Sequence, residues 1–461
     1  MRCMTLAFAC ALATLTWPTL SRAATLPAPS PLPASSAVPA SPVASPTVAT
    51  AISPMPGATQ QLVALTLAEA QRLARTTDPA LNAKRAQLAA AQGTLTDSRA
   101  WLYNNPQLSY DRTRRDVPEP AGTDRRREWS GGVTQALEIA GQRGYRKASA
   151  EASLTALEAE IDQARLQARV DVTREFARVL VLQRRVELER DAASLFQTTA
   201  SAVAKRKSAG EDTRLDANVA TVEAERALNQ RAQAEEGLVE ARSELAQRLQ
   251  LPSNQLPQAV GEPSTLADPV PYSLDQLLSD LARQPRLRAL SAREDAARSR
   301  LDLERASRYP DVTVGVSAGR EGSADARERL TTFSVSVPLP LFRRNAAGVG
   351  QANSDLTAAQ LDRSVGMRAA ESDVRALWSR LQSLQTRVQR LQGSVVPALN
   401  DNYQLSIKSQ RAGEIGLLDL IVVNRQALDA RRDLLDALLD YQTTRAALEA
   451  AAGWVPEGSN Q

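Results

Sequence analysis

The sequence contains no histidine, and its only two cysteines, Cys3 and Cys10, lie close to the N-terminus. Without histidine or a later cysteine, the chain cannot build a Ser-His-Asp or Cys-His nucleophilic site or an H-E-x-x-H zinc site. It also has no P-loop and no G-x-G-x-x-G motif, and beyond residue 23 the only soft metal ligands are Met55 and Met367. These absences predict a protein that is not an enzyme, with no cofactor, no resident metal and no catalytic residue.

Aromatic residues are scarce, at 4% of the chain, and Ala, Leu, Arg, Glu and Gln prevail. This composition is typical of long helices and coiled coils. Beyond residue 23, no stretch reaches the ~18 consecutive apolar residues of a transmembrane helix. Arg and Glu interleave along the helical stretches, as in the run Arg184, Arg185, Glu187, Glu189 and Arg190. We interpret such runs as solvated helix faces, and the lack of a long block of one sign predicts no nucleic-acid partner.

The N-terminal region has the pattern of an export signal followed by a leader. Residues 1–23 combine Arg2, an apolar run and small residues before a cleavage site after Ala23, which predicts a signal peptide. Lipidation of Cys10 is an alternative, although the three residues before it match that signal poorly. Residues 24–61 are rich in Pro and Ala with almost no charge, which predicts a disordered leader.

The most informative feature that is present is a duplication. An Ala-Gly-Glu triplet followed by Leu-Asp after three residues occurs at 209–216 and again at 412–419, an offset of 203 residues. A fixed internal period indicates one structural unit used twice. We therefore divide the chain into a first repeat at 62–260 and a second repeat at 261–461.

Each repeat is predicted to contain a helix, a β-hairpin and a long helical hairpin. Helical patterning begins near Leu65, and strict apolar alternation from Val312 to Leu339 marks the clearest strands. The β-hairpins are expected at about 105–138 and 309–340, and the helical hairpins at about 142–250 and 345–452. Each helical hairpin would be roughly 90 Å long at ~1.5 Å per residue.

The two β-hairpins leave two alternatives open. Their strands are about 10 residues long, with one apolar face, which suits a tilted transmembrane strand. Four strands have open edges, however, and unpaired backbone groups are not tolerated in lipid. Either the sheet lies outside a membrane, or several copies of the chain share one barrel.

Several segments, in order, resemble landmarks of the TolC-type outer-membrane efflux proteins, over about residues 62–453. They are Asn105-Pro106-Gln107-Leu108, the segment Gln135–Arg143, the segment Val337–Asn345, Pro397 and the duplicated Ala-Gly-Glu motif. The Pro338-Leu339-Pro340-Leu341-Phe342 stretch is most similar to the cobalt–zinc–cadmium branch, whose members are outer membrane factors of RND-type exporters.

The resemblance implies a mainly α protein that forms a TolC-like homotrimer. Each protomer would add four strands to one twelve-stranded transmembrane β-barrel in the outer membrane, and the coiled-coil hairpins would form a tunnel through the periplasm. It further implies a periplasmic adaptor, an inner-membrane RND-type pump and outer-membrane lipid as partners, and opening by an iris-like untwisting. The cargo would be heavy-metal cations, whose export would confer metal resistance, or otherwise drugs or other small molecules.

The resemblance also implies roles for individual residues. The periplasmic tip and adaptor-docking residues would be Ala209, Gly210, Glu211, Leu215, Asp216, Ala412, Gly413, Glu414 and Leu418. Asp419 would form a gate at the entrance, although Val422 stands where some members carry a second Asp. Pro106, Pro310, Pro338 and Pro340 would mark the ends of the barrel strands.

Other interpretations remain for these residues and for the whole chain. Asp216 and Asp419 can equally serve as first-turn charges that cap helices. The segment 211–214 is charged whereas 414–417 is mostly apolar, so we expect different roles for the two tips, with the second packing at the closed entrance. A periplasmic adaptor or a soluble coiled-coil scaffold is the alternative function, but neither explains two helical hairpins that alternate with two β-hairpins.

Overall fold

The computed structural model describes residues 61–454, apart from 120–121, 324–325 and 413. These residues belong to one compact unit, 58–461. The predicted signal peptide at 1–23, with Cys10, and nearly all of the predicted leader at 24–61 lie outside the described residues.

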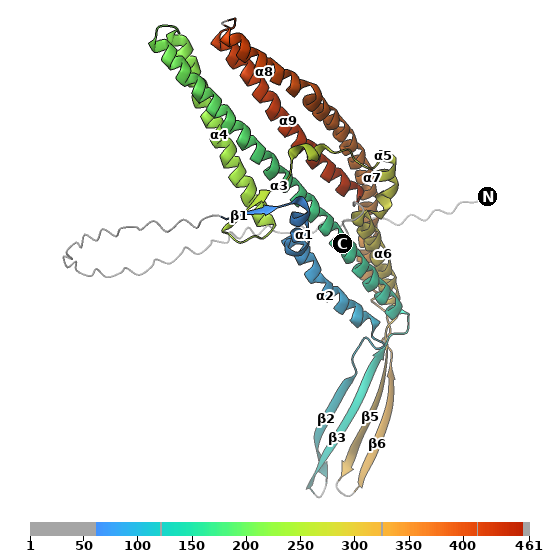
Figure 1. Cartoon of the computed structure of the whole chain (residues 1–461). Coiled ribbons are helices and arrows are strands. Elements are labelled where there is room, and N and C mark those ends of the chain that lie inside the picture. Colours follow the sequence, from blue (N-terminus) through green and yellow to red (C-terminus); the bar gives the residue numbers. More distant parts are fainter. Residues whose placement is uncertain (1–60, 120–121, 324–325, 413, 455–461) are drawn as a thin grey trace, which may run out of the picture. The chain divides into compact units, whose positions relative to one another are not determined.

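The described chain alternates helical and strand segments in the same order twice (Figure 1). The helices are α1 (Leu67–Thr77), α2 (Pro79–Arg99), α3 (Gln142–Ser208), α4 (Arg214–Arg248), α5 (Leu274–Asp280), α6 (Pro285–Ala306), α7 (Ala346–Arg390), α8 (Val396–Arg411) and α9 (Leu417–Ala452). The strands are β1 (Gln61–Leu65), β2 (Gln107–Glu119), β3 (Gly122–Leu137), β4 (Gln255–Ala259), β5 (Val312–Ser323) and β6 (Ala326–Ser336). Short 3₁₀ turns η1 (Pro263–Ala267) and η2 (Leu281–Arg283) precede α6, and a π-helical turn η3 (Leu391–Val395) joins α7 to α8.

Both repeats begin with the same helix start. Thr66 forms a capping box with Glu69 at the start of α1, and Ser273 forms one with Gln276 at the start of α5. In each case the side-chain oxygen and the third helical residue satisfy backbone N–H groups that the helix itself leaves unpaired. The second repeat therefore restarts at the same local chemistry as the first.

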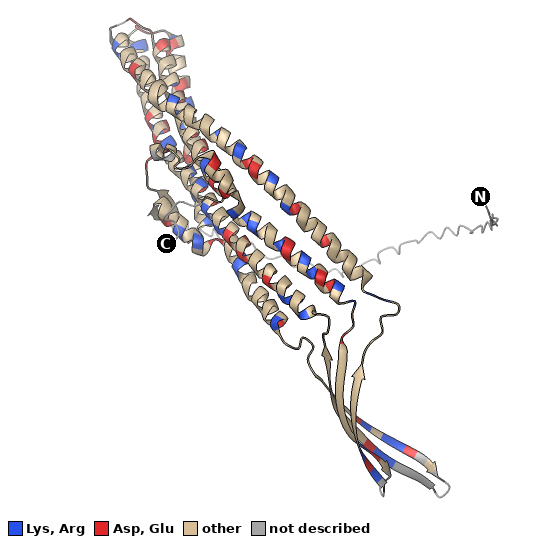
Figure 2. Ribbon diagram, turned by 90° about the vertical axis from the view of Figure 1, so that its right-hand side faces the viewer, with Lys and Arg blue, Asp and Glu red and all other residues tan. Residues whose placement is uncertain are grey.

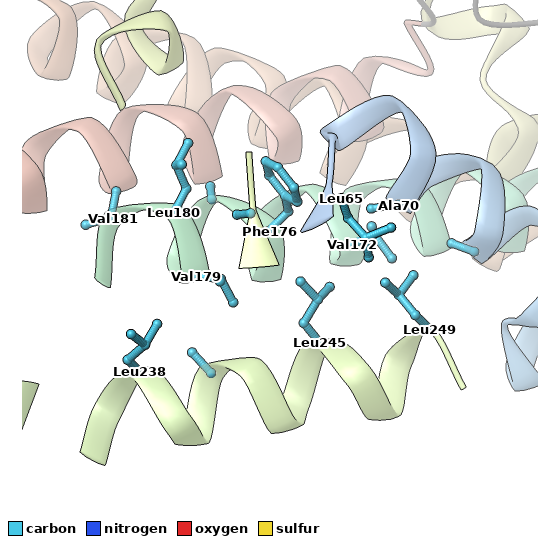
Figure 3. Close-up of a cluster of buried hydrophobic side chains, with 14 of the residues drawn as sticks. Leu65, Ala70, Val172, Phe176, Val179, Leu180, Val181, Leu238, Leu245 and Leu249 are labelled. Atoms are coloured by element: carbon cyan, nitrogen blue, oxygen red, sulfur yellow. The ribbon is translucent and has the colours of Figure 1, made fainter. Parts of the chain in front are cut away.

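The long helices pack around two apolar clusters, one in each repeat. The first cluster joins β1, α1, α3, α4 and β4 through side chains such as Leu65, Val172, Phe176 and Leu245 (Figure 3). The second joins α5, α6, α7 and α9, and Tyr441 is completely buried in it. Burial of side chains of this size stabilises by about 1.5–3 kcal/mol each, so these clusters fix the helical frame.

Strands β1 and β4 pair in parallel over five residues and connect the two ends of the first repeat. The sequence analysis missed both strands and placed Leu65 in a helical stripe, whereas Leu65 ends β1 and the helix starts at Leu67. Five-residue strands are too short to show a reliable alternation, and their pairing joins segments about 190 residues apart.

The second long helix is interrupted where the first is continuous. α3 runs without a break for 67 residues, about 100 Å. The corresponding α7 gives way to η3 immediately before Pro397, which lies in the first turn of α8. Proline has no N–H to donate and its ring crowds the preceding turn. The wider π turn accommodates the missing hydrogen bond and the bulk of the ring.

A four-stranded antiparallel sheet has the order β2-β3-β5-β6. Both predicted β-hairpins, β2–β3 and β5–β6, join through β3 and β5. The register places Leu108 opposite Val133, Val133 opposite Val316, and Val316 opposite Phe333. Because neighbours in register share a face, one face of the sheet is apolar in this row. Among the described residues, no helix is both long and apolar enough to cross a membrane.

Candidate functional site

The first copy of the duplicated motif is the turn between α3 and α4. Gly210 has φ +83°, a left-handed conformation that favours glycine. Its N–H donates to the Lys207 carbonyl at 3.0 Å, and the Glu211 N–H donates to the Arg206 carbonyl at 2.9 Å. These two bonds form a Schellman motif, which satisfies the last carbonyls of α3.

α4 then starts with a complete capping box. The Asp216 N–H donates to the Thr213 hydroxyl oxygen at 3.1 Å, and the Asp216 carboxylate accepts from the Thr213 hydroxyl at 2.6 Å and from its N–H at 3.2 Å. The hydrogen bond from the Thr213 hydroxyl, followed by that from its backbone, lowers the pKa of Asp216. The carboxylate is therefore ionised at neutral pH and engaged in its own turn.

The second copy repeats this geometry with fewer bonds. The Glu414 N–H donates to the Ser409 carbonyl at 2.9 Å, the counterpart of the Glu211 bond, and Ala412 caps α8. α9 starts after Gly416, which has no side chain to accept a bond. Within the described part of the turn, Asp419 accepts one hydrogen bond, from the Gly416 N–H at 3.3 Å. The predicted Gly413 lies outside the described residues. Asp419 is exposed and accepts one hydrogen bond, whereas Asp216 accepts two, both through the same oxygen, Oδ2.

Apolar side chains stand in water beside both turns. Leu215 and Val222 are exposed at the start of α4, and Leu418 and Val422 are exposed at the start of α9. Leu418 is the residue that corresponds to Leu215 in the duplication. Each pair lies at helical spacing on one side of its helix, so each turn carries an exposed apolar patch.

The second turn packs against the first hairpin. Leu417 contacts the apolar cluster of Ala192, Phe196 and Ile421 and also the cluster of Val203, Ala217 and Ala220. We call this contact between α9 and the first helical hairpin the seam. Much of it consists of alanine, which lets the helices approach closely. Leu417 of the second turn provides this contact, and different roles for the two tips remain a prediction.

Below this seam, two ion pairs join α9 to the first hairpin. The Arg425 guanidinium donates twice to Glu223 on α4, once at 2.8 Å and once in a still closer contact. One heptad further along, Arg432 donates twice to Glu189 on α3, at 2.8 and 2.5 Å. We refer to these two pairs as the tethers.

The interpretation of Glu189 as part of a solvated face is wrong. Glu189 is 1% exposed and also accepts from Arg185 at 3.1 Å. Burial acts to lower the pKa of Arg432, but the hydrogen bonds and charge of Glu189 outweigh it and leave that pKa raised. None of the four tether residues was predicted as a contact between the hairpins from the sequence, where the seven-residue spacing of Arg425 and Arg432 was the one available signal.

At the opposite end of the helices, the predicted prolines flank the strands. Pro106 directly precedes β2, Pro310 lies just before β5, and Pro338 and Pro340 follow β6. A residue without an N–H at these positions prevents the ladder from extending.

A polar cluster fixes this junction between strands and helices. Arg146 donates to both oxygens of Glu138, at 2.5 and 2.8 Å, and lies 3.7 Å from the centre of the Tyr103 ring. Asn104 donates to Asp311 at 3.3 Å, and burial, followed by the charge of Glu138, raises the pKa of Asp311. Among the described residues, no group of three or more His, Cys, Asp or Glu is arranged to hold a metal ion.

Two strand hairpins that pair into one sheet, each followed by a long helical hairpin with a matched turn at its end, define an elongated class of channel-like α+β proteins. The family model described as "Outer membrane efflux protein" matches residues 70–249 and 278–454, and the chain belongs to this family. It is an outer-membrane efflux channel.

Individual relatives agree with this assignment. The cobalt-zinc-cadmium resistance protein CzcC of Cupriavidus metallidurans is 26% identical over 380 residues, which cover 82% of this chain and 85% of the relative. The solved CmeC outer membrane channel of Campylobacter jejuni superposes with a TM-score of 0.72 at 12% identity, over 84% of this chain and 85% of that one. The outer membrane protein VceC of Vibrio cholerae gives a TM-score of 0.68 at 19% identity, over 84% and 96% of the two chains.

Proposed function

We propose that this channel works as a homotrimer in a tripartite efflux system, with a periplasmic adaptor and an inner-membrane RND-type pump. The observation that carries the proposal is the sheet order β2-β3-β5-β6, which leaves β2 and β6 with open edges. A four-stranded sheet with an apolar face and two open edges cannot lie alone in lipid, because unpaired backbone groups cost several kcal/mol each.

Repetition of the chain removes both edges. β2 and β6 run in opposite directions within the sheet, since each of the three neighbouring pairs is antiparallel. The β6 edge of one copy can therefore pair with the β2 edge of the next and continue the same antiparallel pattern. Three copies would give twelve strands and close one barrel in the outer membrane.

Exposed aromatic and apolar side chains support a membrane boundary at the base of the strands. Trp101, Tyr309 and Phe342 are exposed in the segments that connect helices and strands. Aromatic side chains gather at membrane–water interfaces, where the ring is half immersed. The long helical hairpins would then extend from this boundary into the periplasm.

The paired turns are the proposed adaptor-docking site. Ala209, Gly210, Glu211, Leu215 and Asp216 form the first turn, and Ala412, Glu414, Leu418 and Asp419 lie in the second, with Gly413 between them. The exposed Leu215 and Leu418 would be buried by the adaptor. We propose Asp419 as the entrance gate, because its exposed carboxylate accepts a single hydrogen bond at 3.3 Å, whereas that of Asp216 is held by two bonds from Thr213.

The proposed cargo class is heavy-metal cations, which rests on the relationship to a cobalt-zinc-cadmium resistance protein. We assign ion selection to the pump rather than to the channel wall, since the whole chain has no histidine. Deletion of the gene should lower the tolerated concentrations of zinc, cobalt and cadmium. Sensitisation to lipophilic drugs alone would contradict this cargo assignment without affecting the channel assignment.

A direct test uses the purified full-length protein in detergent. Native mass spectrometry should give three copies per particle, and insertion into planar bilayers should give stepwise conductance. A monomer that stays soluble without detergent and leaves bilayers unaltered would refute the proposed function and favour the scaffold alternative.

A further inference from the structure

The two faces of the four-stranded sheet carry opposite charge excess at the end farthest from the helices. Figure 2 shows the half of the sheet next to the helices without charged residues and the charges confined to the distal half. The register and the alternation of side chains assign each distal charge to one face. The charged side chains are distributed unequally between the two faces.

Among the strand residues whose side chains the structure describes, six arginines share the apolar face. Trp129 lies in register with Arg112 and Arg320, and Arg320 lies opposite Arg329, so these residues form one row. The next row outward places Arg114 opposite Arg127 and Gly322 opposite Arg327. We call this set the arginine belt: Arg112, Arg114, Arg127, Arg320, Arg327 and Arg329.

The belt lacks internal neutralisation. Asp116 is the one acidic residue of the described distal side chains on this face, and it lies 3.5 Å from Arg114. The other five belt residues are exposed, and the described part of the chain supplies no ion pair to them. Exposed like charges in adjacent rows repel one another, so this arrangement costs stability unless an external anion occupies it.

The opposite face shows that the excess does not simply follow from the composition of the strand ends. At the same levels it carries Arg115 and Arg126 together with four carboxylates, those of Asp111, Glu128, Glu321 and Glu328. Arg115 lies 3.4 Å from the buried Glu128. Among the described side chains, the polar face therefore carries an excess of carboxylates, whereas the apolar face carries a large excess of arginine.

The depth of the belt matches a headgroup region. Val312 begins the apolar rows of β5, and Arg320 lies eight residues further along the strand. Eight residues span about 27 Å, or about 20 Å of depth for a strand tilted by ~40°, which is close to the apolar band of an outer-membrane protein. The belt starts where the apolar rows end, with Trp129 at the boundary.

We infer that the arginine belt binds the phosphate groups of phosphorylated lipid headgroups in the outward-facing leaflet of the membrane. The guanidinium group forms two parallel hydrogen bonds to a phosphate, and it keeps its charge at every physiological pH. All six belt cations are arginine and none is lysine, which suits this bidentate geometry. The inference rests on the proposed placement of the sheet in the membrane, and not on the adaptor, the pump or the cargo.

The experiment uses full-length protein in detergent and fluorescent lipopolysaccharide as the probe, with enzymatically dephosphorylated lipopolysaccharide for comparison. The test variant is Arg320→Gln/Arg329→Gln, which removes two arginines that face each other across β5 and β6. The matched control is Arg115→Gln/Arg126→Gln, which removes two arginines that face each other across β2 and β3 on the opposite face. Circular dichroism and native mass spectrometry confirm that each variant keeps its fold and assembly.

We expect the belt variant to bind the phosphorylated probe about tenfold or more weakly, since each arginine near an anionic surface contributes about fivefold. The control should change affinity by less than about twofold. Arg320→Lys/Arg329→Lys keeps the charge without the bidentate geometry, so its affinity should lie between those of the wild type and the glutamine variant. If either variant fails to fold, the wild-type protein still decides the matter, because it should prefer the phosphorylated probe over the dephosphorylated one.

Three results would overturn the inference: equal loss in the control, equal binding of both probes, or full displacement by millimolar inorganic phosphate, which would indicate a site for free anions. Conductance in planar bilayers distinguishes failure of the lipid-binding inference from failure of the proposed channel function. A belt variant that keeps both its conductance and its lipid affinity removes the belt alone, whereas a wild-type protein without conductance removes the membrane placement.

Discussion

The tether between Glu189 and Arg432 offers the most direct test of what holds the two helical hairpins together. Glu189→Gln keeps the size and one acceptor oxygen of the side chain but removes its charge. The Arg432 side chain is largely buried, with 15% of its surface exposed. It would keep Asp429 at 2.9 Å and Gln230 at 2.8 Å, and would lose the charge of Glu189, which accepts two of its hydrogen bonds.

The expected magnitude follows from this partial loss. Removal of one partner of a buried ion pair costs about 3–5 kcal/mol, because the other charge stays buried without compensation. Since Arg432 retains two acceptors, we expect the lower end, about 3 kcal/mol. The matched control is Glu371→Gln, which breaks an exposed pair with Arg375 on α7 at 2.8 Å. An exposed pair at this spacing contributes about 0.3–0.5 kcal/mol.

The assay is urea unfolding of the detergent-solubilised protein, followed by the helical circular-dichroism signal. A double-mutant cycle with Glu189→Gln, Arg432→Gln and the double variant isolates the pair itself. We expect a coupling free energy of at least about 1.5 kcal/mol that persists in 0.5 M salt, since buried pairs are screened little. A coupling below about 0.5 kcal/mol, or one that salt abolishes, would refute the conclusion that this tether is a buried structural link.

Three further predictions concern the paired turns. Asp419→Ala should raise single-channel conductance and weaken block by divalent cations by about tenfold, because three like carboxylates would act together at one constriction. Asp216→Ala is the control. Unchanged conductance and block in Asp419→Ala would remove Asp419 from the gate. Leu418→Glu and Leu215→Glu should abolish cellular efflux while conductance of the purified channel persists, and a variant that still supports efflux would exclude that leucine from the docking surface. Hydrogen bonds from Thr213 lower the pKa of Asp216. The stabilising capping box is therefore complete above the ordinary Asp pKa of about 4 and is lost as the pH falls through the lowered value. Hydrogen exchange in the first turn of α4 should rise only below about pH 4, and Asp216→Asn should remove this pH dependence.

Local periodicity made much of this structure predictable. The alternation around Val316 and Phe333 placed the strands, because side chains on a strand repeat every two residues. The duplicated glycine motif placed the helix turns, because Gly210 needs a left-handed backbone. The division into repeats at 62–260 and 261–461 remains a prediction, although the capping boxes at Thr66 and Ser273 support it.

Contacts between distant segments could not be predicted in the same way. β1 pairs with β4, and β3 pairs with β5, across about 180 to 190 residues, and nothing in a local pattern specifies such a partner. Glu189 sits four residues after Arg185, the spacing of an ordinary surface pair. Its burial becomes visible only when α9 brings Arg432 against it. The arginine belt likewise depends on register, since alternation alone does not align four strands.

The composition of the seam explains why charged tethers matter for this channel. Ala192, Ala193, Ala224 and Ala227 form much of the apolar contact between the first hairpin and α9. Alanine buries little apolar area, so close packing at this seam yields modest stabilisation and tolerates sliding of one helix along another. Bidentate Arg–carboxylate pairs do not tolerate sliding, because both hydrogen bonds require one alignment. Arg425 and Arg432, one heptad apart on α9, therefore fix both the register and the separation of the hairpins. Any motion that moves the second turn away from the first must break both tethers, and the free energy for it has to come from a bound partner or from new pairs formed in the displaced position.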